Sequence, residues 1–408
     1  MFDVEKIRKD FPMITNHPDL IYFDSAATSF KPRSVIDTVI DYYERNNCNI
    51  HRGDYDISFA VSKRYDDTRK TIARFINAKR PEEIVYTYGA TSSLNIVAIN
   101  FAKKFLKKGD VILTSEVEHA SDVLPWFKAA EQSGAIIKYV PFPESGRFDL
   151  EAYEKCFENE NVKIVALPHV SNVLGYIYPM KQIAAIAHKH GAYIAVDGAQ
   201  AVPHIKVDVQ DLDIDFLSFS SHKMLGPAGI GVLYGRYELL EQMDPVFYGG
   251  GSNARFYPDC SIILKNTPEK FEAGTPDIEG VLGLGKAIEY LEELGMDNVE
   301  EYGKQLAGYF ISKLEKLDNV TVYNHGAEAG IVTFNVNGIF AQDAAGYFNK
   351  QGIAVRTGNH CAKMLDQIIG VNETIRASMY IYNTKDEIDR FVDVIKETTL
   401  EKCVDSIL

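Results

Sequence analysis

The chain has 408 residues, of which 46% are hydrophobic and 25% are charged, a composition typical of a globular protein with a sizeable core. Its 43 basic and 57 acidic residues give a net charge of −14, which argues against nucleic acid or an anionic membrane as a partner. No apolar run approaches the length of a membrane span, and the N-terminus has no apolar segment of the kind found in signal peptides.

The cysteines are widely spaced and odd in number: Cys48, Cys156, Cys260, Cys361 and Cys403. None belongs to a Cys-x-x-Cys or Cys/His cluster, so we expect no metal site. This usage favours a reducing, cytoplasmic setting. If a cysteine has a role, we expect that role to be chemical rather than structural.

Between about residues 84 and 235, short apolar runs alternate with segments of helical period. Such alternation predicts a mostly parallel sheet covered on both faces, with ligands bound at the carboxyl ends of the strands. We expect strands at 83–88, 111–115, 136–142, 162–169, 192–197, 215–220 and 229–234, and helices at 91–106, 121–133, 150–157 and 181–190.

Residues 245–280 are rich in Pro, Asn and Gly, and a second pattern follows them. It predicts helices at 282–294, 299–317, 342–351 and 385–398, and strands at 319–323, 330–336, 353–356 and 374–380. We interpret this part as an α+β unit. The expected division is a large domain at 18–278 and a small C-terminal domain at 279–408 that also includes residues 1–17.

An aspartate and a lysine follow two of the predicted strands. Asp197 ends the strand at 192–197, and Lys223 comes just after the strand at 215–220. Pyridoxal phosphate (PLP) chemistry needs such a pair, because lysine holds the aldehyde as a Schiff base and a carboxylate keeps the pyridine nitrogen protonated. Read singly, Asp-Gly is a common turn and Ser-His-Lys a plausible polar loop. Together, at strand ends, they favour the catalytic interpretation.

Three further segments allow two interpretations each. The segment 89–93 lies between a strand and a helix, which suits a phosphate but also describes an ordinary N-cap. His119 could stack on a flat cofactor ring and move a proton, or it could cap a loop. Asn172 could bond a ring hydroxyl or a carboxylate.

The C-terminal part adds a cysteine and two arginines. Cys361 lies in a Gly-containing loop near Arg356 and His360, surroundings that favour the reactive thiolate; a buried, inert cysteine is the alternative. Arg376 interrupts an apolar strand, so it needs a partner. That partner could be a substrate carboxylate or an internal one.

Taken together, the chain resembles the cysteine desulfurases of the class V aminotransferases, which are fold type I PLP enzymes. It is most similar to their second group, associated with SUF-type sulfur assembly and including selenocysteine lyase-like members. The similarity covers nearly the whole chain and rests on the segments 22–28, 49–53, 118–126, 169–175, 196–201, 222–223, 271–276, 354–361 and 376–378.

The resemblance implies a PLP-dependent homodimer that converts L-cysteine to L-alanine and passes sulfur to an acceptor or scaffold protein, in iron–sulfur cluster assembly or another pathway. It implies that Lys223 forms the Schiff base and that Cys361 takes the sulfur as a persulfide. It further implies that the cofactor ring is contacted by Asp197, Gln200 and His119. The phosphate would be held by Thr91, Ser220, His222 and the other subunit's Thr275. The substrate carboxylate would be bound by Arg376 and Asn172, and Arg356 would support the Cys361 loop or the substrate.

The chain departs from the family pattern at Ala90, Ser221, Asn359 and the segments 252–256 and 363–366. Ala90 stands where the family usually has a phosphate-binding threonine. Two alternatives to a desulfurase stay open: a selenocysteine lyase or other class V PLP enzyme, and a non-catalytic scaffold. The joint presence of Lys223, Asp197, His119 and Cys361 argues against the scaffold.

Overall fold

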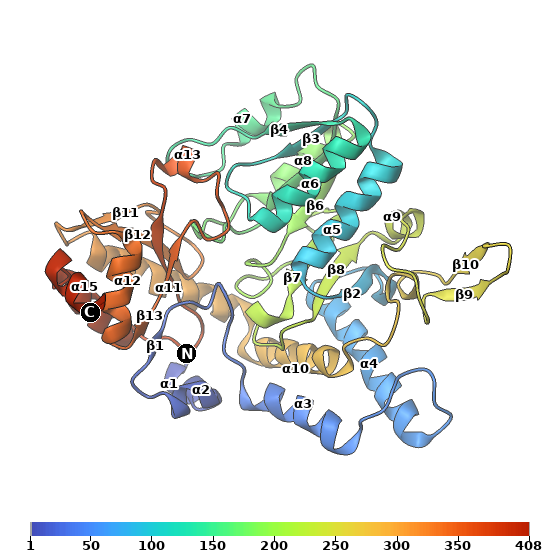
Figure 1. Ribbon diagram of the computed structural model, residues 1–408, viewed down its shortest axis with the longest axis horizontal. Coiled ribbons are helices and arrows are strands. Elements are labelled where there is room, and N and C mark those ends of the chain that lie inside the picture. Colours follow the sequence, from blue (N-terminus) through green and yellow to red (C-terminus); the bar gives the residue numbers. More distant parts are fainter. Residues whose placement is uncertain (1, 408) are drawn as a thin grey trace.

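The computed structural model describes residues 2–407, and its centre is a seven-stranded sheet with the order β2-β8-β7-β6-β5-β3-β4 (Figure 1). Strands β4, β3, β5, β6 and β7 are parallel, and β8 runs antiparallel to both of its neighbours. The predicted α/β class is confirmed. The strands are β2 (Ile84–Thr87), β3 (Val111–Thr114), β4 (Ile136–Tyr139), β5 (Val162–Pro168), β6 (Tyr193–Asp197), β7 (Phe216–Ser220) and β8 (Gly231–Gly235).

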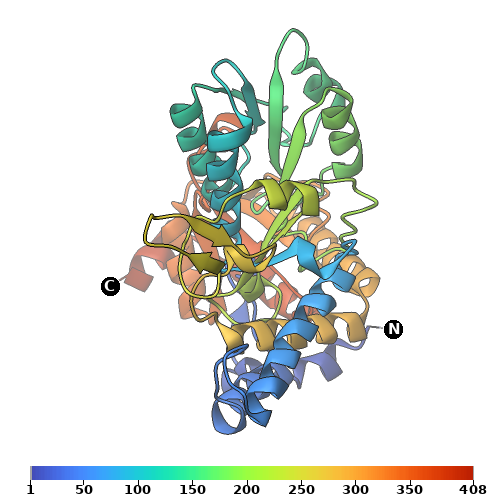
Figure 2. The same ribbon diagram turned by 90° about the vertical axis from the view of Figure 1, so that its right-hand side faces the viewer.

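Helices cover both faces of this sheet, as the continuous apolar strands require. Alternate residues of one strand enter different cores: Ile164 packs with α5 (Ala90–Asn100) and α6 (Ala120–Ser133), whereas Val165 packs with α8 (Met180–Lys189). Figure 2 shows the two layers on either side of the strands. The chain also forms α7 (Leu150–Lys155), α9 (Tyr237–Gln242), a π turn at Phe101–Phe105 and 3-10 turns at Pro81–Glu83, Ser221–Lys223 and Glu269–Phe271.

The N-terminal segment is helical and contacts both parts of the molecule. Helix α10 (Ile278–Leu294) packs against α3 (Arg33–Arg45) and α4 (Asp56–Phe75) beside the large sheet. Strand β1 (Ile21–Tyr22) instead pairs with β13 (Ile353–Ala354) of the C-terminal part. Two short helices precede β1: α1 (Val4–Arg8) and α2 (Pro12–Asn16). The expected domain boundary at 278/279 stays a prediction.

The C-terminal part has a four-stranded sheet with the order β11-β12-β15-β14 and a core of its own. Its strands are β11 (Val320–Val322), β12 (Ile331–Val336), β14 (Arg356–Gly358) and β15 (Thr374–Ser378), and its helices are α11 (Met296–Leu314), α12 (Ala341–Lys350), α13 (Asp366–Ile369), α14 (Lys385–Lys396) and α15 (Leu400–Ile407). None of the helices within residues 2–407 is long and apolar enough to cross a membrane.

Two expectations about elements were wrong in detail, and one segment without an expected element forms a hairpin. The strand expected at 353–356 is two strands, because β13 pairs with β1 while β14 pairs with β15. The helix expected at 91–106 ends at Asn100 and continues as a π turn. Within 245–280 the chain forms a hairpin that projects from the body, β9 (Asn253–Phe256) and β10 (Ile262–Leu264) (Figures 1 and 2).

Candidate active site

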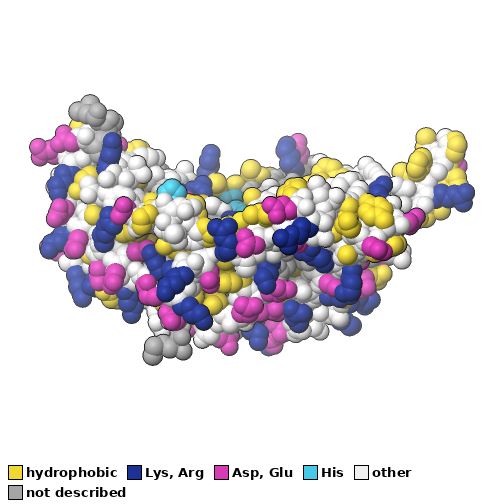
Figure 3. Space-filling view, turned by 90° about the horizontal axis from the view of Figure 1, so that it is seen from below, with side chains coloured by type: hydrophobic (Ala, Val, Ile, Leu, Met, Phe, Trp, Pro, Cys, Tyr) yellow, Lys and Arg dark blue, Asp and Glu magenta, His cyan; other side chains and the backbone are white. Residues whose placement is uncertain are grey.

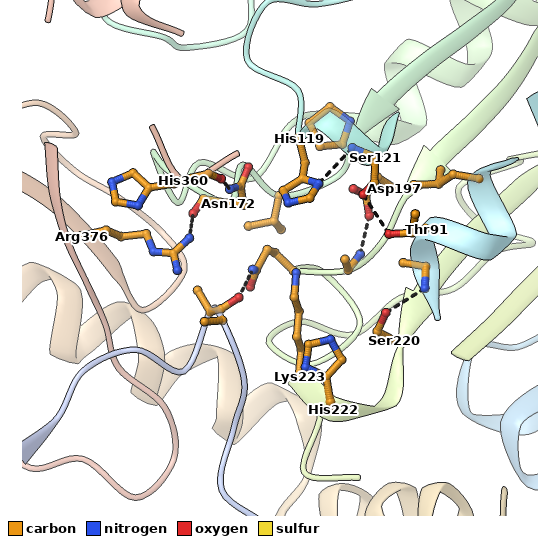
Figure 4. A pocket seen from close by; sticks show the side chains of 18 of the residues that line it. Thr91, His119, Ser121, Asn172, Asp197, Ser220, His222, Lys223, His360 and Arg376 are labelled. Carbon is orange, nitrogen blue, oxygen red and sulfur yellow. Dashed lines mark hydrogen bonds between the residues drawn. The ribbon is translucent and has the colours of Figure 1, made fainter. Parts of the chain in front are cut away.

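A cavity of about 210 Å³ lies where β5, β6 and β7 end, at the edge of the large sheet that faces the C-terminal part (Figure 4). Parallel strands present their carboxyl ends there, which is where ligands bind in such folds. The cavity brings together most of the residues selected from the sequence: Thr91, His119, Asn172, Asp197, Gln200, Ser220, His222, Lys223, Arg356 and Arg376. Cys361 and Thr275 are not among its lining residues.

Lys223 ends the 3-10 turn after β7, and its side chain points into the cavity (Figure 4). The turn is held through the carbonyl of His222, which accepts hydrogen bonds from the Ser29 N–H at 3.0 Å and from the Thr28 hydroxyl at 3.1 Å. Burial lowers the pKa of Lys223, and the negative charge of Asp197 opposes that shift. A lowered pKa makes the neutral, nucleophilic amine more accessible.

Asp197 and Gln200 both line the cavity. Asp197 ends β6, is buried, and its Oδ1 accepts a hydrogen bond from the Ala199 N–H at 2.8 Å. Gln200 donates from Nε2 to the Ala26 carbonyl at 2.9 Å. Its Oε1 is buried and has no hydrogen-bond partner among the described residues. A buried acceptor left open in this way favours a ligand that donates.

One corner of the cavity is formed by the N-terminus of α5. Gly89 precedes the helix with a φ of 130°, and the Ala90 N–H donates to the Ser220 hydroxyl at 2.7 Å. The hydroxyl of Thr91 bonds that of Ser121 at 2.8 Å. Ser121 was not selected from the sequence, although its place two residues after His119 could have suggested it. Because helix N-termini attract anions, this corner suits a phosphate.

His119 caps α6, and its ring lines the cavity (Figure 4). Its Nδ1 accepts a hydrogen bond from the Ser121 N–H at 3.1 Å, so the neutral ring carries its proton on Nε2. Burial lowers the pKa of His119, and the positive charge of Lys223 lowers it further. The ring is therefore a neutral donor.

Arg376 lies on β15 and is 2% exposed. Its guanidinium donates to the Asn172 carbonyl at 2.9 Å and to Oδ1 of Asp24 at 3.1 Å, while Nε has no partner among the described residues. Burial raises the pKa of Asp24, and the charge of Arg376 opposes that rise. Of the two partners considered for Arg376, the internal carboxylate is present. Asp24 had no predicted role, although it stood in a segment that carried the resemblance.

Cys361 is exposed in the loop after β14. Its carbonyl accepts from the Ala120 N–H at 2.7 Å, and Arg356 donates to its Sγ at 3.6 Å. His360 and Cys361 have φ angles of 51° and 61°, which hold the loop in a conformation that side chains disfavour. The ring of His360 is buried, and its Nε2 bonds the Thr374 hydroxyl at 2.9 Å. Of the two expected neighbours, Arg356 therefore bonds the sulfur and His360 bonds Thr374.

Thr275 lies away from this cavity. Its hydroxyl accepts a hydrogen bond from Nδ2 of Asn49 at 3.4 Å. The neighbouring Gly274 and Pro276 line a second cavity of about 760 Å³, with His51 and Arg52 on its wall. Within one chain, Thr275 is therefore not among the residues that form the phosphate corner.

Comparisons with known proteins agree on one family. The model of the family Aminotransferase class-V matches residues 21–391. A probable cysteine desulfurase of Halalkalibacterium halodurans is 45% identical over 97% of this chain and 98% of its own length. The apo cysteine desulfurase of Thermococcus onnurineus NA1 superposes with a TM-score of 0.92 at 39% identity, covering 96% of this chain and 97% of that one. Cysteine desulfurase CsdA from Escherichia coli, in an S-sulfonic acid form, superposes at 0.91 with 33% identity, covering 99% of each chain.

Proposed function

The chain belongs to the aminotransferase class-V family, and from this premise we propose that it is a PLP-dependent cysteine desulfurase. It converts L-cysteine to L-alanine and carries the sulfur on Cys361 as a persulfide. The observation that carries the proposal is one cavity lined by Lys223, Asp197 and Arg376, next to a loop in which an arginine donates to an exposed cysteine.

The polar groups of the cavity fit each end of this cofactor. The N-terminus of α5, with Thr91, Ser220 and His222, would hold the phosphate, and Ser121 adds a hydroxyl that bonds that of Thr91. The open Oε1 of Gln200 would accept a hydrogen bond from the ring hydroxyl, and Asp197 would hold the proton of the ring nitrogen. Lys223 is positioned for the aldehyde.

When bound, the cofactor withdraws electrons from the substrate and makes its Cα proton labile. Nζ of Lys223, with its lowered pKa, takes and returns that proton. Arg376 binds the substrate carboxylate, and the Nη1 bond to the Asn172 carbonyl orients the guanidinium. His119 would pack on the ring, with its Nε2 proton available to donate.

Cys361 performs the sulfur transfer. Its thiolate attacks the sulfur of the bound substrate, so that a new S–S bond forms and the substrate's C–S bond breaks. The carbon fragment keeps the electron pair of the broken bond, takes a proton, and leaves as alanine. Arg356 supports the loop during this step, because its guanidinium donates to Sγ.

The test is Cys361→Ala. This variant should keep the absorbance of bound cofactor but lose alanine formation from L-cysteine by about 10²-fold or more. Mass spectrometry of the wild-type protein after cysteine treatment should find one added sulfur on the Cys361 peptide.

Cys260→Ala is the matched control, because Cys260 is also exposed but lies on the β9–β10 hairpin, and it should leave alanine formation unchanged. Undiminished alanine formation by Cys361→Ala would contradict the desulfurase mechanism. Release of selenium from selenocysteine by that variant, without sulfur transfer, would favour the lyase alternative.

We further propose a cytoplasmic homodimer in which Thr275 reaches the phosphate of the partner's site. A sulfur-acceptor or scaffold protein takes the persulfide sulfur, and iron–sulfur cluster assembly is the proposed destination. The position of Thr275 outside its own chain's cofactor cavity supports the shared site.

A further inference from the structure

Two acidic side chains are buried at positions adjacent in sequence to His119 and Ser121, which line the cofactor cavity. Glu118 immediately precedes His119, and Asp122 lies in the first turn of α6. Their exposed fractions are 2% and 0%. Burying two ionised carboxylates side by side costs several kcal/mol for each charge unless a cation compensates. Within residues 2–407, no ion pair compensates either group.

Each carboxyl group has one oxygen bonded and one open. The Ser115 hydroxyl donates to Oε1 of Glu118 at 2.6 Å, and the Trp126 indole donates to Oδ1 of Asp122 at 3.2 Å. The other oxygens, Oε2 and Oδ2, are buried with no donor among the described residues. The two residues stand four positions apart at the start of α6, and the carboxyl group of each shifts the pKa of the other. A proton between them would satisfy both groups.

We propose that Glu118 and Asp122 share one proton at neutral pH and form a singly charged carboxyl pair.

The charged and titratable neighbours agree with this assignment. Burial raises the pKa of Glu118 and of Asp122 well above the ordinary range, and the negative charge of Asp197 raises both further. Tyr178, which faces Glu118 from the segment after β5, is itself buried with a raised pKa and so brings no charge. The surroundings therefore hold the proton on the pair.

The pair acts on the cofactor through Asp197. One remaining negative charge, close enough to interact with Asp197, would favour the positive charge of the ring nitrogen, whereas a second charge would have to be desolvated at high cost. Glu118 and Asp122 are therefore positioning residues. This consequence rests on the role proposed above for Asp197; the shared proton does not.

Infrared difference spectra between the wild type and each variant, recorded on the cofactor-free protein, test the shared proton directly. The wild type should show the carbonyl stretch of a protonated carboxyl group at pH 7. Asp122→Asn and Glu118→Gln should each abolish it, because the new amide donates to the remaining carboxylate. Asp110→Asn is the matched control: Asp110 is buried, but both of its oxygens accept N–H donors, and the band should persist.

A wild-type spectrum without the protonated band would overturn the proposal, and so would a band that survives both single substitutions. Emission from Trp126, the chain's single tryptophan, reports whether each variant keeps the fold around Asp122. If one variant fails to fold, the spectra of the other single variant and of the wild type still test the shared proton.

A second experiment measures how the charge of the pair affects PLP binding. Both single variants keep one negative charge and should bind PLP within about threefold of wild type, whereas the uncharged double variant should bind about tenfold more weakly. Wild-type affinity in the double variant, with the infrared result intact, would overturn the link through Asp197 but not the shared proton. Loss of alanine formation by Cys361→Ala is independent of both experiments.

Discussion

At the scale of single residues, the position of Lys223 shows how burial prepares an amine for chemistry. Its pKa is lowered because the charged form loses solvation, and Asp197 prevents a larger shift. The backbone of the preceding residue is fixed by Ser29 and Thr28 from a distant segment. The backbone that carries the amine is therefore held at the cavity.

We predict that Lys223 carries the covalent link to the cofactor. Borohydride reduction of the wild type, followed by peptide mapping, should place the adduct on the Lys223 peptide. Lys223→Ala should bind PLP only non-covalently and lose about 10³-fold or more in turnover, because nucleophile and proton acceptor disappear together. Lys270→Met is the control, because Lys270 is also buried but bonds the Glu241 carbonyl outside the cavity, and this variant should keep the covalent link. An adduct at any lysine other than Lys223 would refute the assignment.

At the scale of elements, the phosphate corner depends on the close approach of β8 and the start of α5. A Cβ placed on Gly231 would lie 2.4 Å from Cα of Gly89 and 2.7 Å from the Phe219 carbonyl oxygen. Both contacts are with backbone, so no side-chain rotation could relieve them. A glycine in β8 therefore allows the N-terminus of α5 to reach the end of β7.

Gly231→Ala should therefore weaken cofactor binding and destabilise the fold by about 1–3 kcal/mol, because β8 must move away from Gly89 and β7. PLP titration and thermal unfolding would measure the two effects. Gly308→Ala, on α11 with no neighbouring atom near its Cβ, should instead stabilise the protein by about 0.5–1 kcal/mol. Normal cofactor affinity in Gly231→Ala would show that the phosphate corner does not depend on the close approach of β8 to the start of α5.

At the scale of the whole molecule, the β9–β10 hairpin carries exposed apolar side chains away from the body (Figure 3). Phe256 is 72% exposed, and Ile262 and Ile263 are each 51% exposed. Apolar surface displayed on a projecting hairpin favours contact with another protein. In the proposed dimer, we expect the hairpin to be covered by the second subunit.

Mixed dimers test whether Thr275 serves the neighbouring site. Thr275→Ala alone should bind PLP several-fold more weakly, since a phosphate ligand is lost. Co-expression with Lys223→Ala should restore one intact site per mixed dimer, with Lys223 from one chain and Thr275 from the other. Cofactor affinity and alanine formation in the isolated mixed dimer are the measurements. If Thr275 acted within its own chain, no site would be restored.

Buried histidines should make the protein sensitive to acid. Burial lowers the pKa of His169 and His204 from 6.5 to about 4, so the unfolded chain binds more protons between these values. Their contribution to stability is full above pH 6.5 and is lost as the pH falls towards 4. Denaturant unfolding at several pH values should show this loss as a fall in the free energy of unfolding. His204→Gln should reduce the slope of that free energy against pH. His17→Gln, at an exposed position, is the control and should keep the wild-type slope. A wild-type slope in His204→Gln would contradict the assignment.

Much of the fold and of the site could be predicted because the signals are local. Apolar runs alternating with helical segments placed all seven strands of the large sheet within a few residues of their observed bounds. Asp197 and Lys223 were selectable because each follows such a run. The resemblance added Gln200, which has no local signal of its own.

The sequence by itself determined the class of fold, the order of the strands along the chain, and the residue types available for chemistry, since these depend on periodicity and strand ends. Only the tertiary structure decided which distant groups meet: Arg376 bonds Asp24, and Cys361 bonds the backbone of Ala120. It also decided that Glu118 and Asp122 are both buried, with no cation paired to either among residues 2–407. Burial and partnership are set by packing between segments far apart in the chain, and a local pattern carries no information about the segment that will cover it.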